Sequence, residues 1–113
     1  MPVLFKSEGP AKDLLPGVKA RIVTLDKLMT LVSEISFGVL DEPLPLHTHP
    51  AEQMTYVLEG ELKVVIEGEE TQHLKPGDLF YVPSNVPHAI QTLSEKVRVL
   101  ECFTPIREDL LKK

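Results

Sequence analysis

The placement of proline and glycine constrains the fold of this chain more than any other feature. Ten prolines and six glycines are spread through 113 residues, so long helices are interrupted almost everywhere. Many short strands with frequent turns are typical of an antiparallel sandwich or a small barrel. The alternative is an α+β fold with one helix in the first forty residues, which is disfavoured because no apolar stripe of period 3.6 is sustained there. The expected strands and strand-like runs are 18–24, 28–37, 54–58, 62–66, 71–74, 79–83, 86–93 and 96–103.

Local turn signals add two finer expectations. The tripeptide EGE at 59–61 predicts a tight hairpin between the runs 54–58 and 62–66. After Pro105, the sequence IREDLLKK at 106–113 predicts a short C-terminal helix.

Length and composition bound the class of protein. A chain of 113 residues with 42% hydrophobic content fits one domain over 1–113. The net charge of −5 and the absence of a basic block disfavour nucleic acid as a partner. The sequence contains no run of eighteen apolar residues, so no membrane span is expected. The N-terminal sequence lacks a signal-peptide pattern, and a cytoplasmic location is therefore expected. Cys102, the single cysteine, excludes an intrachain disulfide and is expected to be a small buried residue.

Two of the four histidines stand two residues apart. In a strand, His47 and His49 point to the same side, and Pro50 then allows a bend. Such a pair is either an ordinary set of polar residues on a sheet or half of a metal site, since a metal needs further ligands. His73 lies in a polar hairpin and is expected at the surface.

The sequence from 41 to 60 resembles the first motif of the cupin family, G-x5-H-x-H-x3-E-x6-G. His47, His49 and Gly60 match it, whereas Asp41 replaces the first glycine and Gln53 replaces the glutamate.

The second cupin motif, G-x5-P-x-G-x2-H-x3-N, is similar to residues 77–92. Gly77, Pro83 and His88 match it, while Asn85 and Thr92 replace a glycine and an asparagine. Asn tolerates the left-handed conformation that a glycine here implies. The resemblance implies an all-β, antiparallel jelly-roll barrel with a short C-terminal helical segment.

The family resemblance also implies a metal site. Its ligands would be His47, His49, Gln53 and His88, which suit one divalent transition metal such as Ni, Zn, Fe, Mn or Co. Four neutral ligands leave the charge of the ion uncompensated, which favours an anionic substrate or hydroxide at its open positions. The alternative is a metal-free cupin whose histidines fill a polar cavity.

The strand expected at 96–103 carries an acid among apolar residues. Glu101 shares one face with Val99 and Phe103, whereas Leu100 and Cys102 make the opposite face apolar as well. Periodicity alone therefore leaves open whether Glu101 points into the barrel or into solvent. A strand that is apolar on both faces is expected if its outer face packs on a partner subunit, and this agrees with the homodimer that the family resemblance implies.

Three segments, HTHPAEQMTYVLEGEL, LKPGDLFYVPSNVPHA and LECFTPIREDLL, narrow the resemblance to the pectin-degradation cupins. Those proteins open the ring of 4,5-unsaturated uronates. The resemblance implies catalytic roles for Glu101, Phe103 and Arg107, although the subgroup usually has aspartate at position 101. Glu101 would move a proton, Arg107 would pair with the substrate carboxylate, and Phe103 would pack on the sugar. An exposed Arg107 with no such role is the alternative.

Residues Met54, Tyr56 and Tyr81 are expected mainly in the core or the barrel wall, with a cavity lining as the alternative. Two other functions compete with uronate ring opening. One is a metal-dependent dioxygenase of the quercetinase type, disfavoured because such members usually keep the glutamate that Gln53 replaces. The other is a non-catalytic cupin that binds a small molecule. In each case the expected partner is a small molecule, and for the first function it is an anionic sugar acid.

Overall fold

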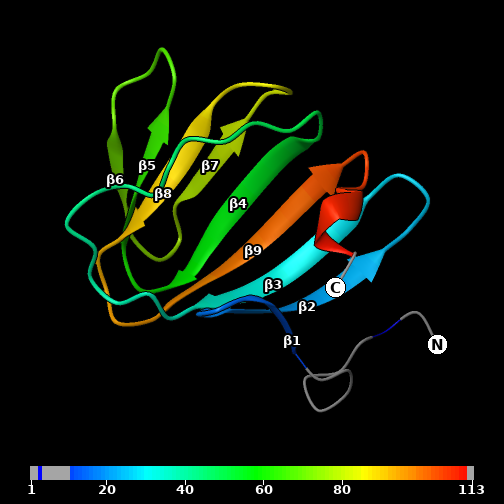
Figure 1. Ribbon diagram of the computed structural model, residues 1–113, viewed down its shortest axis with the longest axis horizontal. Coiled ribbons are helices and arrows are strands. Elements are labelled where there is room, and N and C mark those ends of the chain that lie inside the picture. Colours follow the sequence, from blue (N-terminus) through cyan, green and yellow to red (C-terminus); the bar gives the residue numbers. More distant parts are fainter. Residues whose placement is uncertain (1–2, 4–10, 112–113) are drawn as a thin grey trace.

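The computed structural model describes residue 3 and residues 11–111. These residues form two antiparallel sheets that pack face to face, as the predicted jelly-roll class requires (Figure 1). The strands are β1 (Lys12–Leu15), β2 (Val18–Thr24), β3 (Met29–Ile35), β4 (Glu52–Glu59), β5 (Leu62–Ile66), β6 (Gln72–Leu74), β7 (Leu79–Val82), β8 (His88–Thr92) and β9 (Val97–Thr104).

The larger sheet has the order β1-β2-β3-β9-β4-β7 and the smaller one the order β6-β5-β8. Alternate residues of β3 are buried from Met29 to Ile35, and the same alternation buries Gln53 and Thr55 of β4. Buried apolar side chains form two clusters. One cluster is centred on Val57 and Val97, and the other contains Met29, Leu31 and Phe103. Polar inward-facing residues lie between these apolar groups.

The hairpin predicted at 59–61 is wrong. β4 pairs with β7 and β9, whereas β5 pairs with β6 and β8, so the chain crosses from one sheet to the other at Gly60. Gly60 has a φ of 79°, and a Cβ atom there would meet the carbonyl oxygen of Lys96. Close approach of two backbones, together with a positive φ, explains a glycine at this crossing.

The predicted C-terminal helix is reduced to one 3-10 turn, η1 (Glu108–Leu110), and residues 112–113 lie outside the described part of the chain. A segment this short cannot repay helix nucleation on its own. Packing fixes it instead, since Ile106 and Leu110 contact the cluster around Met29 and Leu31.

The other expected strands agree with the structure to within a few residues, although β1 was not foreseen. Met54, Tyr56 and Tyr81 were expected in the core or the barrel wall, or else lining the cavity, and the core and cavity positions are both wrong. Their side chains lie on the outer face of the larger sheet and are 59%, 39% and 67% exposed. Cys102 is half-buried, with its Sγ 3.8 Å from Thr30 Oγ1.

Two expectations concern the N-terminus and membrane spans. The reading of the N-terminus falls mainly on residues outside the described ones. Among residues 3 and 11–111, there is no helix with the length and apolar character needed to cross a membrane.

Candidate metal centre and active site

Three histidines, two from the loop before β4 and one from the start of β8, lie close together. His47 and His88 exchange two backbone hydrogen bonds of 3.0 Å, which join the loop before β4 to the start of β8. His49 follows on the same side of the chain, and its ring centroid lies 4.9 Å from that of His88. One ring nitrogen from each histidine lies within 4.8 Å of the others, so these residues could hold a metal ion.

Backbone carbonyls fix the tautomers of two of these rings. His49 Nδ1 lies 2.8 Å from the carbonyl oxygen of Ala51, and His88 Nδ1 lies 2.8 Å from that of Val86. A carbonyl only accepts hydrogen bonds, so each Nδ1 is the protonated nitrogen and each neutral ring presents the lone pair of Nε2 to the site. The turn before His88 uses Asn85 at a φ of 61°, as its place in the second motif predicts.

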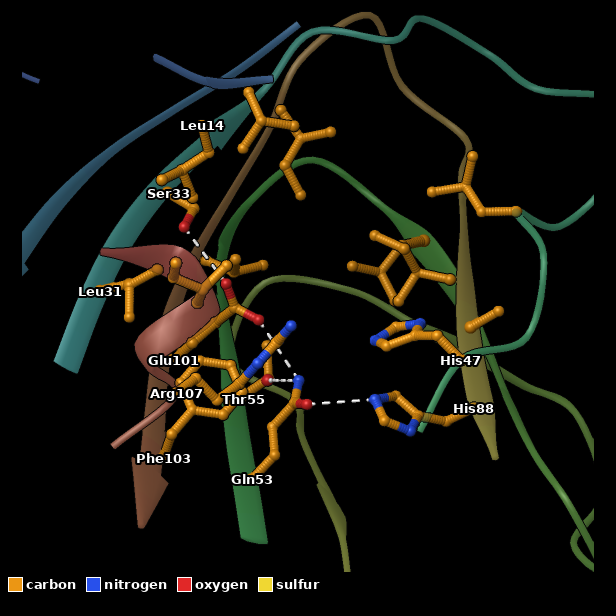
Figure 2. A pocket seen from close by; sticks show the side chains of 18 of the residues that line it. Leu14, Leu31, Ser33, His47, Gln53, Thr55, His88, Glu101, Phe103 and Arg107 are labelled. Atoms are coloured by element: carbon orange, nitrogen blue, oxygen red, sulfur yellow. Dashed lines mark hydrogen bonds between the residues drawn. The ribbon is translucent and has the colours of Figure 1, made fainter. Parts of the chain in front are cut away.

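Gln53 completes the convergence from β4 (Figure 2). Its Oε1 lies 3.1 Å from His49 Nε2. The same atom lies 3.2 Å from His88 Nε2, the contact drawn in Figure 2. Its Nε2 donates to Thr55 Oγ1 at 2.9 Å and to Glu101 Oε2 at 3.3 Å, which identifies the atom facing the histidines as the oxygen. With neutral rings, these atoms present only lone pairs to one another. A cation between them satisfies all of them, so the donor set fits a metal ion.

Protonation of His47 and His88 is unfavourable in this setting. Burial lowers the pKa of His88, and the charges of His49 and Arg107 lower it further against the opposing effect of the Val86 carbonyl. Partial burial, followed by the charges of His88, Arg107 and His49, lowers the pKa of His47 from 6.5 to about 4, although this residue lies at the exposed side of the site. The neutral form of these two imidazoles, which is the form that ligates metals, is therefore favoured at neutral pH.

A cavity of about 260 Å³ opens beside the histidines. Its walls are largely apolar, and a few polar groups lie at one side, as in many small-molecule sites. The polar lining consists of Ser33, His47, Gln53, Thr55, His88, Glu101 and Arg107.

The side chain of Glu101 points into this cavity, which settles the question that periodicity left open (Figure 2). Ser33 Oγ donates to its Oε1 at 3.2 Å, and Gln53 donates to its Oε2. Burial raises the pKa of Glu101, although the Ser33 hydrogen bond and the charge of Arg107 act in the opposite direction. An acid held in this way lies beside the candidate metal ligands and faces the cavity.

Arg107 reaches the cavity from the turn that precedes η1. Its guanidinium carbon lies 5.2 Å from the ring centroid of Phe103, and its Nη2 donates to Asp109 Oδ2 at 2.7 Å. The Arg107 side chain is only 16% exposed, so the reading of this residue as an ordinary surface charge does not describe its surroundings. Burial alone would raise the pKa of Asp109, but the hydrogen bond and charge of Arg107 outweigh it and lower the pKa.

Sequence reasoning missed three polar residues of this site: Ser33, Thr55 and Asp109. Ser33 interrupts the apolar face of β3, and Thr55 stands two residues after Gln53 on the same face of β4. A polar residue on an inward-facing face was the available signal in both cases. The surface position predicted for His73 is confirmed, since its side chain is 44% exposed and pairs with Glu61.

Comparison with known proteins agrees with this fold and site. A model of the cupin domain matches residues 40–103, which is more than half of the chain. The chain belongs to the cupin family. The pectin degradation protein KdgF of Dickeya dadantii is 35% identical over 106 residues, which cover 92% of this cupin and 93% of KdgF.

Two solved structures are similar over nearly their whole length. KdgF from a Halomonas species has a TM-score of 0.80 and 30% identity, with 94% of this cupin and 96% of that chain covered. An RmlC-like cupin from Shewanella frigidimarina has a TM-score of 0.83 and 28% identity, with 96% and 95% covered. A more distant relative, the oxalate decarboxylase OxdC of Bacillus subtilis, is 36% identical over 94 residues, but only 24% of OxdC is covered.

Proposed function

We propose that this cupin binds one divalent transition metal and opens the ring of an unsaturated uronate or a related sugar acid. The similarity to two KdgF proteins, one of them named for pectin degradation, supports the substrate class. The observation that carries the proposal is the arrangement around Gln53, where an amide oxygen and two imidazole lone pairs face one another at 3.1–3.2 Å. The proposed ligands are His47, His49, Gln53 and His88.

The bound metal would supply Lewis acidity toward substrate oxygens. The chain supplies the proton chemistry and the orientation. Glu101 faces the cavity and has a raised pKa, which suits a group that takes a proton from a substrate hydroxyl and returns it to the enol carbon system. The ring opens as the hemiacetal C–O bond breaks, and the resulting enol becomes a ketone.

Arg107 is proposed to bind the substrate carboxylate. Its guanidinium lines the cavity, and the charge-assisted contact would orient the sugar relative to Glu101. Phe103 is only 2% exposed, because His49 and Arg107 lie against its ring. Its proposed role is therefore to support the guanidinium, with little ring area left to contact a sugar.

The test uses metal-loaded protein and a 4,5-unsaturated monouronate. Loss of the conjugated-alkene absorbance without oxygen uptake is the expected result. Oxygen uptake would favour the dioxygenase function, and binding without turnover would favour a non-catalytic binding module; either outcome contradicts the proposal.

Two variants identify the acid. Glu101→Gln keeps the size of the side chain and removes the carboxyl group that accepts and returns the proton, so alkene loss is expected to fall at least about a hundredfold. Glu61→Gln is the matched control, because Glu61 pairs with His73 at the surface, away from the cavity. Equal activity of both variants would remove Glu101 from the mechanism.

We further propose that this cupin is a homodimer and that the outer face of the larger sheet forms the interface. The strand register places Met54 beside Tyr81, and Tyr56 between Leu79 and the half-buried Leu100, so these side chains form an apolar patch on the outer face. Sedimentation at micromolar concentration is expected to give a dimer that Tyr81→Arg converts to monomer. Leu25→Arg, on the exposed loop after β2, is the control and should remain dimeric. A wild-type monomer would contradict this interface.

A further inference from the structure

The position of Gln53 between the histidines and Glu101 links two groups that the proposed mechanism treats separately. On one side its Oε1 faces His49 and His88. On the other side its Nε2 donates to Glu101 Oε2 at 3.3 Å (Figure 2). We propose that Gln53 and Glu101 form one functional pair, in which the acid at position 101 requires an amide at position 53. This inference rests on the proposed metal site, because the pair orients Gln53 toward the ion.

The hydrogen bonds that Gln53 donates explain why a carboxylate at position 53 cannot replace the amide beside Glu101. A glutamate there would place an acceptor oxygen where the Gln53 amide nitrogen now donates to both Thr55 Oγ1 and Glu101 Oε2. Two carboxylates would then face each other in a cavity with largely apolar walls, where like charges repel strongly. Gln53→Glu would therefore lose both donor contacts of the amide nitrogen and place a second carboxylate beside Glu101.

Positioning residues complete the pair from both sides. Thr55 accepts the second amide hydrogen at 2.9 Å and is 2% exposed, so water does not replace its hydroxyl. Ser33 donates to the other oxygen of Glu101 at 3.2 Å. The amide oxygen therefore points to the histidines because the amide nitrogen is held by Thr55 and Glu101. Ser33, in turn, holds the acid.

A double-mutant cycle tests the pair in metal-free protein. The four proteins are wild type, Gln53→Glu, Glu101→Gln and the double variant, which exchanges the amide and the carboxylate. We expect Gln53→Glu to lower the folding equilibrium constant and the double variant to recover part of the loss. The folding equilibrium constant of the double variant should exceed the value expected from two independent substitutions by at least about fivefold. Urea unfolding at one fixed pH measures all four.

Gln91→Glu is the matched control. Gln91 is also a buried glutamine, 9% exposed, but its Nε2 donates to the carbonyl oxygen of Leu40, and it does not line the cavity. This variant is expected to lose stability, and its effect should add to that of Glu101→Gln within experimental error.

Cobalt(II) titration of the same proteins separates this inference from the metal proposal. We expect wild type to bind cobalt, Gln53→Glu to bind it at least about tenfold more weakly, and the double variant to recover affinity. Additive effects in the cycle, or tighter cobalt binding by Gln53→Glu, would overturn the pair while leaving the metal site intact. Failure of wild type to bind cobalt would overturn the metal proposal, and the metal-free cycle would still decide whether the pair exists.

Discussion

Replacement of Thr55 by valine tests whether the orientation of the Gln53 amide matters for metal binding. Valine has nearly the shape of threonine and suits a strand, so the backbone of β4 should not change. The substitution removes the hydroxyl that accepts the 2.9 Å hydrogen bond from Gln53 Nε2 at a site that is 2% exposed. An unsatisfied buried donor costs about 1–3 kcal/mol, a large share of the roughly 5–15 kcal/mol that stabilises a typical domain.

The effect on the metal should be separable from the loss of stability. Residues that orient a ligand typically change metal affinity by about 10–100-fold, which corresponds to about 1.4–2.8 kcal/mol. Urea unfolding of the metal-free protein measures the loss of folding stability. Competition with a chromophoric zinc chelator measures the loss of metal affinity. Gln53 would keep a single donor contact, to Glu101 at 3.3 Å, and its oxygen would no longer be fixed toward the histidines.

Thr92→Val is the matched control for this prediction. Thr92 is 0% exposed, and its hydroxyl donates to the carbonyl oxygen of Gly38 at 2.6 Å, but it does not line the cavity. Both variants should lose stability, and only Thr55→Val should lose metal affinity. Zinc affinities of the two variants that agree within about twofold would refute the orienting role of Thr55.

Three further outcomes are expected. Gly60→Ala should destabilise the protein in urea by about 1–2 kcal/mol more than Gly68→Ala, because both glycines have positive φ but only Gly60 has backbone atoms in the way of a Cβ; equal losses would contradict the crossing described here. Arg107→Lys should raise the KM for an unsaturated uronate with a smaller change in kcat, since lysine lacks the planar fork; an unchanged KM removes Arg107 from substrate binding. Zinc at a hundred times its dissociation constant should raise Tm by about 10 °C, and no shift would argue against a native-state site.

Local sequence patterns predicted most of the strands. Alternating polar and apolar residues mark strands reliably, because side-chain direction in a strand depends on local geometry. The crossing at Gly60 was misread for a related reason: two strands separated by a glycine turn look like a hairpin whether or not they pair. Pairing depends on which distant strands bury the same face, and β4 finds its partners in β7 and β9.

The site shows the same division between local and distant information. The resemblance of two motifs to the cupin family implied that His47, His49 and His88 meet Gln53, and the structure brings these side chains together. The inward direction of Glu101 could not be derived from β9 alone, since both faces of this strand are apolar. Ser33 acquires its role through a contact with Glu101 from another strand. Thr55 acquires its role by holding its neighbour on β4, Gln53, whose amide also reaches Glu101 on β9. Asp109 acquires its role through the turn that replaced the predicted helix.

The central claim is that three imidazoles and the Gln53 amide oxygen hold one metal ion. Titration of metal-free protein with cobalt(II), followed by visible absorption, tests it most directly. The account predicts saturation at one ion per chain for wild type and loss of that absorption band in His88→Ala, which removes one of the converging nitrogens. Absence of saturable binding by wild type, or an unchanged band in His88→Ala, would contradict the account.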